Sequence, residues 1–321
     1  MLYPLKLNAA FKDYLWGGTR LRDEFNKQTD IDPVAESWEL SCHHDGQSII
    51  SNGEFSGKTL AQYIETVGKQ VIGTKAPKDK DFPILIKFID AKQSLSVQVH
   101  PDDKYALLHE GESGKTEMWY VMDATPDATL IYGFTHEISH QEFERRIKDN
   151  TLLEVCNQVP IKKGDVFFIE AGTLHAIGAG ALIAEIQQSS NSTYRVYDYG
   201  RVGKDGKLRE LHIEKALAVT KLEPPTRKPE PIAKLTAFAD YDLTILAQCE
   251  LFNVSHFDLH GNCSLNANKD SFHSILVLDG QIALTYGNDS FTITKGESVF
   301  IPADMGEYIL NGTGEFILTT L

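Results

Sequence analysis

The sequence predicts a mainly β protein built from two copies of one β-barrel unit, with a few inserted helices. The chain has 321 residues, about twice the ~150-residue length that is typical of one domain. Short runs of β-branched and aromatic residues recur between turn-forming residues over most of this length. Two separated pairs of segments also resemble each other, which is the signature of an internal repeat.

Three helices are expected in the N-terminal part. Apolar residues at helical spacing predict the first helix, over 58–73. Ser139, followed three residues later by Glu142, forms a capping-box pattern and predicts a second helix over 139–150. A short third helix is expected over 211–219.

The strands of the N-terminal part follow from composition and alternation. Runs rich in Val, Ile, Phe and Tyr predict strands over 82–90, 95–100, 117–122, 129–133, 165–169 and 181–187. We expect the strands over 117–122 and 129–133 to pair with each other around an Ala-Thr-Pro-Asp turn, and 171–175 to form a turn that ends at His175.

A proline-rich segment divides the chain. Residues 223–231 contain four prolines in nine residues, which is typical of a linker. We therefore expect a first domain over 1–222, a linker over 223–235 and a C-terminal β domain over 236–321. Within the C-terminal domain the pattern predicts short strands over 251–257, 274–278, 281–286, 289–293, 298–301 and 315–319.

The internal repeat relates the two domains. Residues 117–123 resemble 273–279, and residues 163–175 resemble 295–307. In this alignment His273 takes the position of Glu117, and nothing in the second copy corresponds to the Gln-Val-His segment at 98–100. We therefore expect only the first domain to bind a metal ion.

Composition excludes several classes of function. Lys and Arg number 31 against 45 Asp and Glu, a net charge of −14, so we expect neither nucleic acid nor an anionic membrane as a partner. No apolar run approaches the roughly 18 residues of a membrane span, and the first residues lack the pattern of a signal peptide. The four cysteines are scattered and form no CxxC motif. This indicates a reducing, cytoplasmic setting and excludes a thiolate zinc cluster.

Four side chains are candidate ligands of a divalent cation. Gln98 and His100 are two residues apart in a predicted strand and therefore share one face. Glu117 begins a neighbouring strand, and His175 ends a nearby turn. Two imidazoles, a carboxylate and an amide oxygen suit Zn²⁺ or another borderline ion with one open position. Taken singly, each histidine is also compatible with an ordinary hydrogen-bonded position.

Basic residues near these candidates suit an anionic substrate. Arg195 and Arg201 lie among tyrosines and hydroxyl residues after a predicted strand, and arginine pairs well with a phosphate or a developing oxyanion. An ordinary salt-bridged strand and turn would show the same pattern. Lys115, two residues before Glu117, would share the face of Glu117 and reach a substrate beside the metal.

Six motifs in a fixed order resemble the short bacterial form of the class I mannose-6-phosphate isomerases. They are Trp16-Gly17-Gly18, Glu36–Glu39, Leu95–Asp103, Gly114–Tyr120, Ala171–Ala176 and Tyr194–Arg201. The resemblance implies cupin-like (jelly-roll) barrels, one zinc ion per chain, and interconversion of D-mannose 6-phosphate and D-fructose 6-phosphate. It implies a small sugar phosphate as partner, and we expect a monomer or a weak homo-oligomer.

The resemblance also assigns site residues by position. The zinc ligands would be Gln98, His100, Glu117 and His175, and Arg195 falls on the active-site arginine of the family. The positions that line the family's pocket correspond to Glu36, Lys87, Ser96, Lys115 and Glu185.

These positions suggest roles in an aldose–ketose isomerisation. Glu185 and Lys115 are candidates for the general base, and Arg195 would stabilise the enediolate. Ser96, Lys87 or Arg201 would hold the phosphate.

Three other functions remain possible from the sequence. The first is a sugar-phosphate-binding or regulatory metal cupin without turnover. The second is a metal-dependent cupin oxygenase, which would favour iron. The third is a storage-type double barrel.

Overall fold

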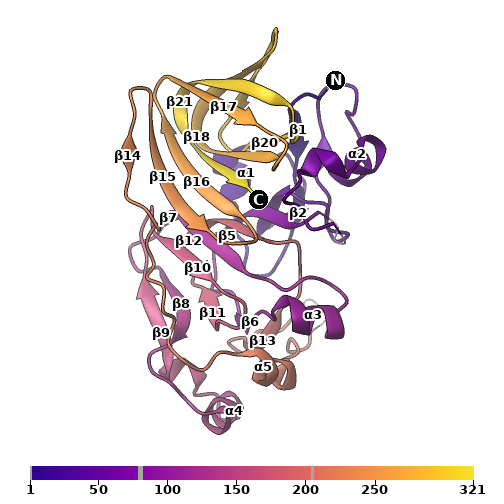
Figure 1. Ribbon diagram of the computed structural model, residues 1–321. Helices are drawn as coiled ribbons and strands as arrows, with labels where there is room; N and C mark the ends of the chain where they lie inside the picture. Colours follow the sequence, from indigo (N-terminus) through magenta and orange to yellow (C-terminus); the bar gives the residue numbers. More distant parts are fainter. Residues whose placement is uncertain (1, 79–81, 204–205) are drawn as a thin grey trace.

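The computed structural model describes residues 2–78, 82–203 and 206–321, and in them the strands form three sheets (Figure 1). The first sheet has the order β10-β7-β12-β5-β3-β2. Its strands, in chain order, are β2 (Ala10–Lys12), β3 (Glu36–Leu40), β5 (Ile84–Ala91), β7 (Glu117–Ala124), β10 (Val166–Ile169) and β12 (Ala181–Gln188). The second sheet has the order β13-β6-β11-β8-β9. Its strands are β6 (Val97–Val99), β8 (Thr129–Phe134), β9 (Cys156–Pro160), β11 (His175–Ile177) and β13 (Tyr194–Tyr197).

The third sheet contains the C-terminal strands together with two strands from the start of the chain. Its main path is β14-β15-β16-β21-β18-β20-β1-β4, with β17 paired to β21 and β19 paired to β18. The strands are β1 (Leu5–Asn8), β4 (Ile49–Ile50), β14 (Thr236–Ala237), β15 (Tyr241–Gln248), β16 (Asn253–Leu259), β17 (Asn262–Ala267), β18 (His273–Tyr286), β19 (Asp289–Thr294), β20 (Ser298–Ile301) and β21 (Gly306–Thr320).

Short helices cover the ends and edges of these sheets. They are α1 (Arg20–Phe25), α2 (Leu60–Val67), α3 (Asp103–His109), α4 (His140–Lys148) and α5 (Ile213–Val219), with 3₁₀ turns η1 (Lys69–Ile72) and η2 (Leu152–Glu154). In the part of the chain that the structure describes, no helix is both long and apolar enough to cross a bilayer.

The strand pairing confirms the internal repeat. The order β10-β7-β12-β5-β3-β2 in the first sheet is matched by β20-β18-β21-β16-β15-β14 in the third. The register also agrees, because Glu117 of β7 pairs with Ile169 and His273 of β18 pairs with Ile301. The fold is mainly β as expected, but the sheets stay open within the described residues, so two closed barrels are not confirmed.

Three expected elements differ from those in the structure. The helix expected over 58–73 is two elements, because Gly68, with φ 111°, ends α2 before η1 begins. Strands β7 and β8 form where expected, but they do not pair. The chain leaves the first sheet at the turn between them and enters the second. The strands expected over 274–278 and 281–286 are one strand, β18, which continues through an irregularity in its pairing with β21 between Val277 and Asp279.

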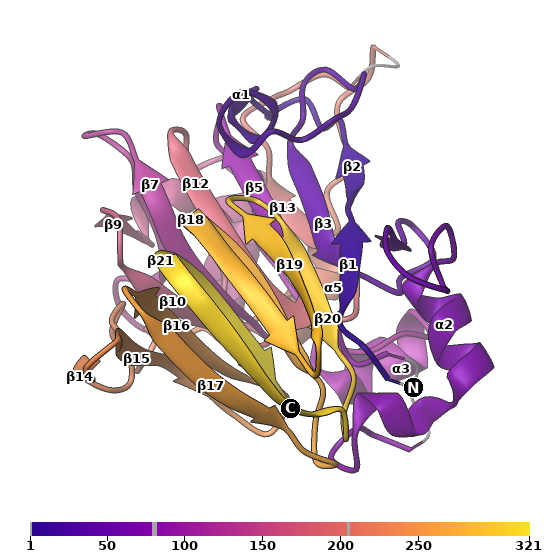
Figure 2. The ribbon, with the colours of Figure 1, turned by 90° about the horizontal axis from the view of Figure 1, so that it is seen from above.

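Alternation gives the first sheet one face in the main core and a second face, the polar face, which carries the buried charged side chains although Trp119, Val121 and Ile183 on it belong to a second apolar cluster. In β7, Met118, Tyr120 and Met122 belong to the largest apolar core, which also contains Leu276 and Ile317 of the third sheet. Figure 2 shows β7, β12 and β5 lying behind β18 and β21 in that view. Because side chains alternate along a strand, the residues between them point to the opposite face, toward the second sheet.

Candidate active site

Four ionisable side chains project from the polar face of the first sheet. They are Glu36 on β3, Lys87 on β5, Glu117 on β7 and Glu185 on β12, and all are buried. Lys87 and Glu185 lie directly opposite each other in the β5–β12 pair. Since charged groups are rarely buried without partners, this face is a candidate for chemistry rather than for packing alone.

The second sheet supplies the facing side of the site. His175 of β11 pairs with Gln98 of β6, and Gln98 pairs in turn with Arg195 of β13. These three side chains therefore come from neighbouring strands, and His100 follows one residue after the end of β6. The two sheets together bring all four candidate ligands to one place.

The candidate ligands form a compact buried cluster. The Nε2 atoms of His100 and His175 lie 3.1 Å apart. Glu117 approaches both of them, with Oε2 3.6 Å from His100 Nε2 and Oε1 3.4 Å from His175 Nε2. The Gln98 amide lies at the edge of the cluster, with its Nε2 3.5 Å from His175 Nε2.

Hydrogen bonds outside the cluster determine which nitrogen of each imidazole carries the proton. His100 Nδ1 lies 2.8 Å from the carbonyl of Ser192, and His175 Nδ1 lies 2.8 Å from the carbonyl of Thr173. A carbonyl can only accept, so Nδ1 donates in both rings and each neutral Nε2 presents a lone pair to the other.

The cluster therefore consists of acceptors. Both oxygens of Glu117 are buried without a hydrogen-bond partner. Burial, reinforced by Lys115, lowers the pKa of His100 well below its usual value, and burial lowers the pKa of His175 to about 4. Burial also raises the pKa of Glu117. Two Nε2 lone pairs and a buried carboxylate face one another here, with the Lys115 ammonium 3.4 Å from one carboxylate oxygen, and this donor set fits a divalent metal ion.

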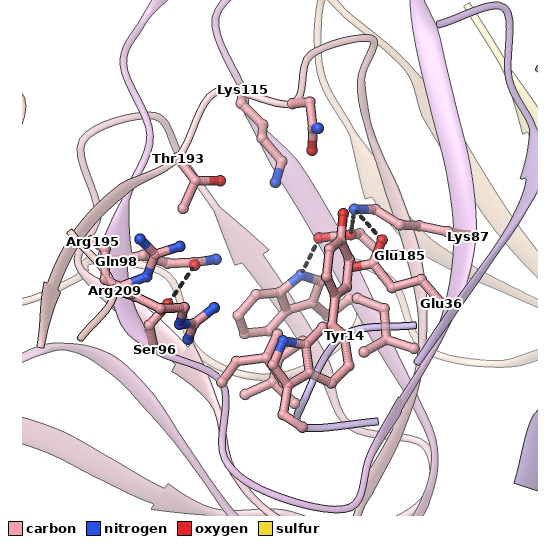
Figure 3. A pocket seen from close by; sticks show the side chains of 16 residues that line it. Tyr14, Glu36, Lys87, Ser96, Gln98, Lys115, Glu185, Thr193, Arg195 and Arg209 are labelled. Carbon is pink, nitrogen blue, oxygen red and sulfur yellow. Dashed lines mark hydrogen bonds and ion pairs between the residues drawn. The ribbon is translucent and has the colours of Figure 1, made fainter. Parts of the chain in front are cut away.

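A cavity of about 280 Å³ opens beside the cluster. In the view of Figure 3, Arg195, Arg209, Ser96 and Gln98 gather on one side, Lys87, Glu36 and Glu185 on the other, and Lys115 lies above. The full lining is Tyr14, Trp16, Glu36, Lys87, Ile89, Leu95, Ser96, Gln98, Lys115, Trp119, Ile177, Glu185, Asn191, Thr193, Arg195 and Arg209.

Lys87 forms ion pairs with two carboxylates on the first sheet. Its Nζ lies 3.1 Å from Glu185 Oε2 and 3.4 Å from Glu36 Oε2. Glu185 Oε1 also accepts the indole N–H of Trp119 at 3.0 Å. Burial opposes ionisation of Glu185, but Lys87 and Lys115 outweigh it and lower its pKa to about 2. Glu185 is therefore an anion beside the cluster at neutral pH.

Lys115 reaches the cluster from the loop before β7. Its Nζ lies 3.4 Å from Glu117 Oε2, and the side chain is buried and lines the cavity. The expectation that Lys115 shares a strand face with Glu117 is wrong in its detail, because β7 begins only at Glu117. The path of the loop before β7 brings the Lys115 ammonium close to Glu117 instead.

The arginines divide into two groups. Arg195 lines the cavity, and its buried Nε has no hydrogen-bond partner, while its Nη1 donates to the carbonyl of Glu210 at 2.9 Å. Arg201 is not among the lining residues. Its guanidinium donates to Asp198 and, at 2.6 Å, to the carbonyl of Ser94.

Sequence reasoning missed several residues of the site. Arg209 lines the cavity, held by the carboxylate of Asp198, and no local pattern in its loop signals this. Trp119 was detectable, because it lies two residues after Glu117 and so shares its face. The carbonyl of Ser192, which bonds His100, is a backbone group, so side-chain types in the sequence do not predict its role.

Comparisons with known proteins agree with one another. Residues 4–128 match the family described as phosphomannose isomerase type I, catalytic domain, and residues 242–321 match mannose-6-phosphate isomerase, cupin domain. The chain is 38% identical to a probable mannose-6-phosphate isomerase, GmuF, of Bacillus subtilis, with 99% of each chain covered. It is also 38% identical to the mannose-6-phosphate isomerase ManA of Bacillus subtilis, again with 99% of each chain covered. A crystal structure of the mannose 6-phosphate isomerase from Bacillus subtilis is similar at a TM-score of 0.91, with 35% identity and 99% of each chain covered.

Proposed function

Because this chain belongs to the type I phosphomannose isomerase family, we propose that it interconverts D-mannose 6-phosphate and D-fructose 6-phosphate as a zinc-dependent isomerase. One observation carries the proposal beyond family membership. Two imidazoles turn unprotonated nitrogens toward each other at 3.1 Å beside a buried carboxylate that makes no hydrogen bond and has the Lys115 ammonium 3.4 Å away. This arrangement is more favourable with a divalent cation than without one. All four cysteines are free thiols, which agrees with an enzyme of the reducing cytoplasm.

One zinc ion per chain would be held by His100, Glu117 and His175, with the amide oxygen of Gln98 as the fourth ligand. Turning the Gln98 amide by 180° would point its oxygen into the cluster, in place of the nitrogen that now lies near His175. When bound, zinc supplies a Lewis acid that polarises the sugar carbonyl.

The residues on the first sheet would move the proton. Isomerisation takes a proton from C2 of the aldose and returns one to C1, through an enediolate. Glu185 and Lys115 are the candidates for this transfer, since both line the cavity beside the cluster. Lys87 keeps Glu185 ionised and fixed in direction. Arg195 would stabilise the enediolate oxygen, a role that suits its unpartnered buried Nε.

The phosphate would bind at the opposite side of the cavity. Ser96 and Arg209 line that side together with Arg195. Lys87 is a weaker candidate, because two carboxylates already neutralise it. Arg201 would act indirectly, through the Asp198 carboxylate that it shares with Arg209. Anchoring the phosphate away from the reacting carbons would orient the sugar.

We also propose that catalysis belongs to residues 1–222, with 223–235 as a linker and 236–321 as a unit without a metal. In the second unit, His273 Nδ1 lies 2.7 Å from the hydroxyl of Tyr308. Glu307, at the repeat position of His175, is exposed instead of facing His273. The two units nevertheless share a sheet, because β1 pairs with β20.

The test combines metal analysis with a coupled assay for fructose 6-phosphate. We expect about one zinc per chain, loss of activity on chelation, and recovery when zinc is returned. His100→Ala should lose both zinc and activity. Full activity in a metal-free sample would contradict the proposal. Stoichiometric binding of the sugar phosphate without product would instead identify a binding or regulatory protein.

A further inference from the structure

A single carboxylate, Glu112, joins three loops near the metal cluster. It lies between α3 and β7 and is 26% exposed. Its oxygens accept hydrogen bonds from the backbone N–H of Asn191, at 3.3 Å, and from the hydroxyl of Ser192. His43 Nε2 lies 3.3 Å from the same carboxylate. Since His43 Nδ1 accepts the N–H of Asp45 at 3.1 Å, the proton of a neutral His43 is on Nε2 and is donated to Glu112.

The loop that Glu112 holds also orients His100. The Ser192 carbonyl accepts the Nδ1 proton of His100 at 2.8 Å. Residues 189–193 connect β12 to β13 and belong to neither strand, so no sheet ladder fixes this carbonyl. Inside the loop, the Ser192 N–H donates to Ser190 Oγ at 3.2 Å. Glu112 therefore lies outside the loop and accepts hydrogen bonds from both Asn191 and Ser192.

The two histidines of the cluster differ in this respect. His175 is oriented by the carbonyl of Thr173, only two residues away in the same turn. His100 depends on a carbonyl 92 residues away in sequence, so its orientation needs tertiary support. Burial opposes ionisation of Glu112, but hydrogen bonds from His43, Ser192 and Asn191 lower its pKa to about 2. Glu112 is thus an anion at neutral pH, and hydrogen bonds to an ionised acceptor are the stronger kind.

We propose that Glu112 is a positioning residue that holds the Ser192 carbonyl against His100 and thereby sets the affinity of the metal cluster for a divalent cation. The inference rests on the proposed function only in requiring that His100, Glu117 and His175 bind a metal. It assigns Glu112 no contact with the substrate. Partners of this kind around a ligating histidine change metal affinity by roughly 10–100-fold.

The experiment measures zinc affinity directly in the full-length protein, by competition with a chromophoric chelator. Glu112→Gln keeps the size of the side chain but removes its charge and replaces one of its two acceptor oxygens with an NH₂ donor, so the amide cannot accept from Asn191, His43 and Ser192 at once. We expect zinc to bind about tenfold more weakly, with a changed visible spectrum of the cobalt-substituted protein. Ser192→Ala removes only one hydroxyl and keeps the carbonyl, so we expect a smaller loss in the same direction.

Glu110→Gln is the matched control. Glu110 follows α3, two residues before Glu112, and also accepts two hydrogen bonds, from Tyr194 and Lys215, both at 2.7 Å. Among the described residues, neither of these donors belongs to the 189–193 loop. Substitution of Glu110 should leave zinc affinity and the cobalt spectrum unchanged.

The outcomes separate the two proposals. Parental zinc affinity and an unchanged cobalt spectrum in both Glu112→Gln and Ser192→Ala would overturn the positioning role alone. Equal weakening by Glu110→Gln would also overturn it, because the effect would then come from general loosening of the loop. A parent protein that binds no divalent cation would overturn the metal site and this inference together. If the protein shows no isomerase activity but the variants differ in zinc affinity as predicted, the inference about Glu112 stands and the catalytic proposal is rejected.

Discussion

At the scale of single residues, proton placement decides what the site can bind. The Nδ1–H groups of His100 and His175 are each committed to a backbone carbonyl. Their Nε2 lone pairs therefore meet beside Glu117, whose buried oxygens make no hydrogen bond and whose Oε2 lies 3.4 Å from Lys115 Nζ. A buried carboxylate without a hydrogen-bond donor is unfavourable, and a divalent cation would reduce that penalty. The same three residues would be a poor structural core and suit a metal site.

The role of Arg195 leads to a prediction about catalysis. Arg195→Ala removes a guanidinium that lines the cavity but is not a proposed metal ligand. We expect kcat to fall by about 10²–10³-fold, as on removal of one oxyanion donor, while zinc content stays at the parental level. Steady-state kinetics with metal analysis checks this. Unchanged kcat would reject the oxyanion role and leave the metal site standing.

At the scale of elements, strand alternation lets one sheet serve two purposes. Strands β5, β7 and β12 direct every second side chain into the main core and the others toward the site and a second apolar cluster beside it. A one-residue slip in register would exchange the two faces.

The close approach of β18 to β21 at Gly280 gives a prediction about stability. Gly280 has φ +81°, and a Cβ there would lie 2.3 Å from the carbonyl oxygen of Thr313. Gly287, at the hairpin after β18, has φ +54° with open space around it. We expect Gly287→Ala to cost about 1–2 kcal/mol for the left-handed backbone alone. Gly280→Ala should cost more, because the backbone of β21 must also move.

Urea denaturation of the two variants measures this difference in the free energy of unfolding. The hairpin variant serves as the control for backbone conformation without a clash. Equal losses in both would show that β18 and β21 have room at Gly280, which would contradict the close approach of the two strands.

At the scale of the whole molecule, the two repeats are joined into one body. The largest apolar core takes residues from both, including Met118 and Leu182 from the first sheet and Phe300 and Ile317 from the third. Polar contacts add to this, such as Lys163 Nζ, 2.9 Å from Glu315 Oε1. The repeat of the sequence is therefore not a repeat of independent units.

Glu315 gives a prediction about pH at this junction. His256, whose Nε2 lies 3.5 Å from Glu315 Oε2, and Lys163 together outweigh the opposing effect of burial and lower the pKa of Glu315 to about 2. A depressed pKa stabilises the folded state above the usual carboxyl pKa, near 4.3. That contribution is lost as the pH falls toward about 2.

The variant Glu315→Gln isolates this contribution. We expect the parent to exceed the variant in free energy of unfolding at neutral pH, and the difference to shrink as the pH falls from about 5 to about 2. Denaturant unfolding at several pH values measures it. A difference that is constant across this range would show that ionisation of Glu315 does not contribute to the stability of the folded state.

Much of the fold was accessible from local patterns. Strands β5, β6, β7, β8, β10 and β12, the capped helix α4 and the repeat of β7 with β18 follow from alternation, capping residues and similarity within the chain. Strands such as β1, β3, β9, β11 and β17 were missed, because their short or mixed sequences carry no clear period. A shared strand face related Gln98 to His100, whereas Glu117 lies in another sheet and only the folded chain brings it to them. The roles of these side chains stay proposals.

Local patterns are enough to predict the type of most elements and the chemistry of the side chains on each face, because alternation and capping are properties of a few adjacent residues. Three features depend on the fold as a whole: β7 and β8 enter different sheets, Arg209 rather than Arg201 lines the cavity, and Ser192 orients His100. These outcomes depend on which distant surfaces bury each other and on where loops must run to connect them. No short segment of the chain contains that information.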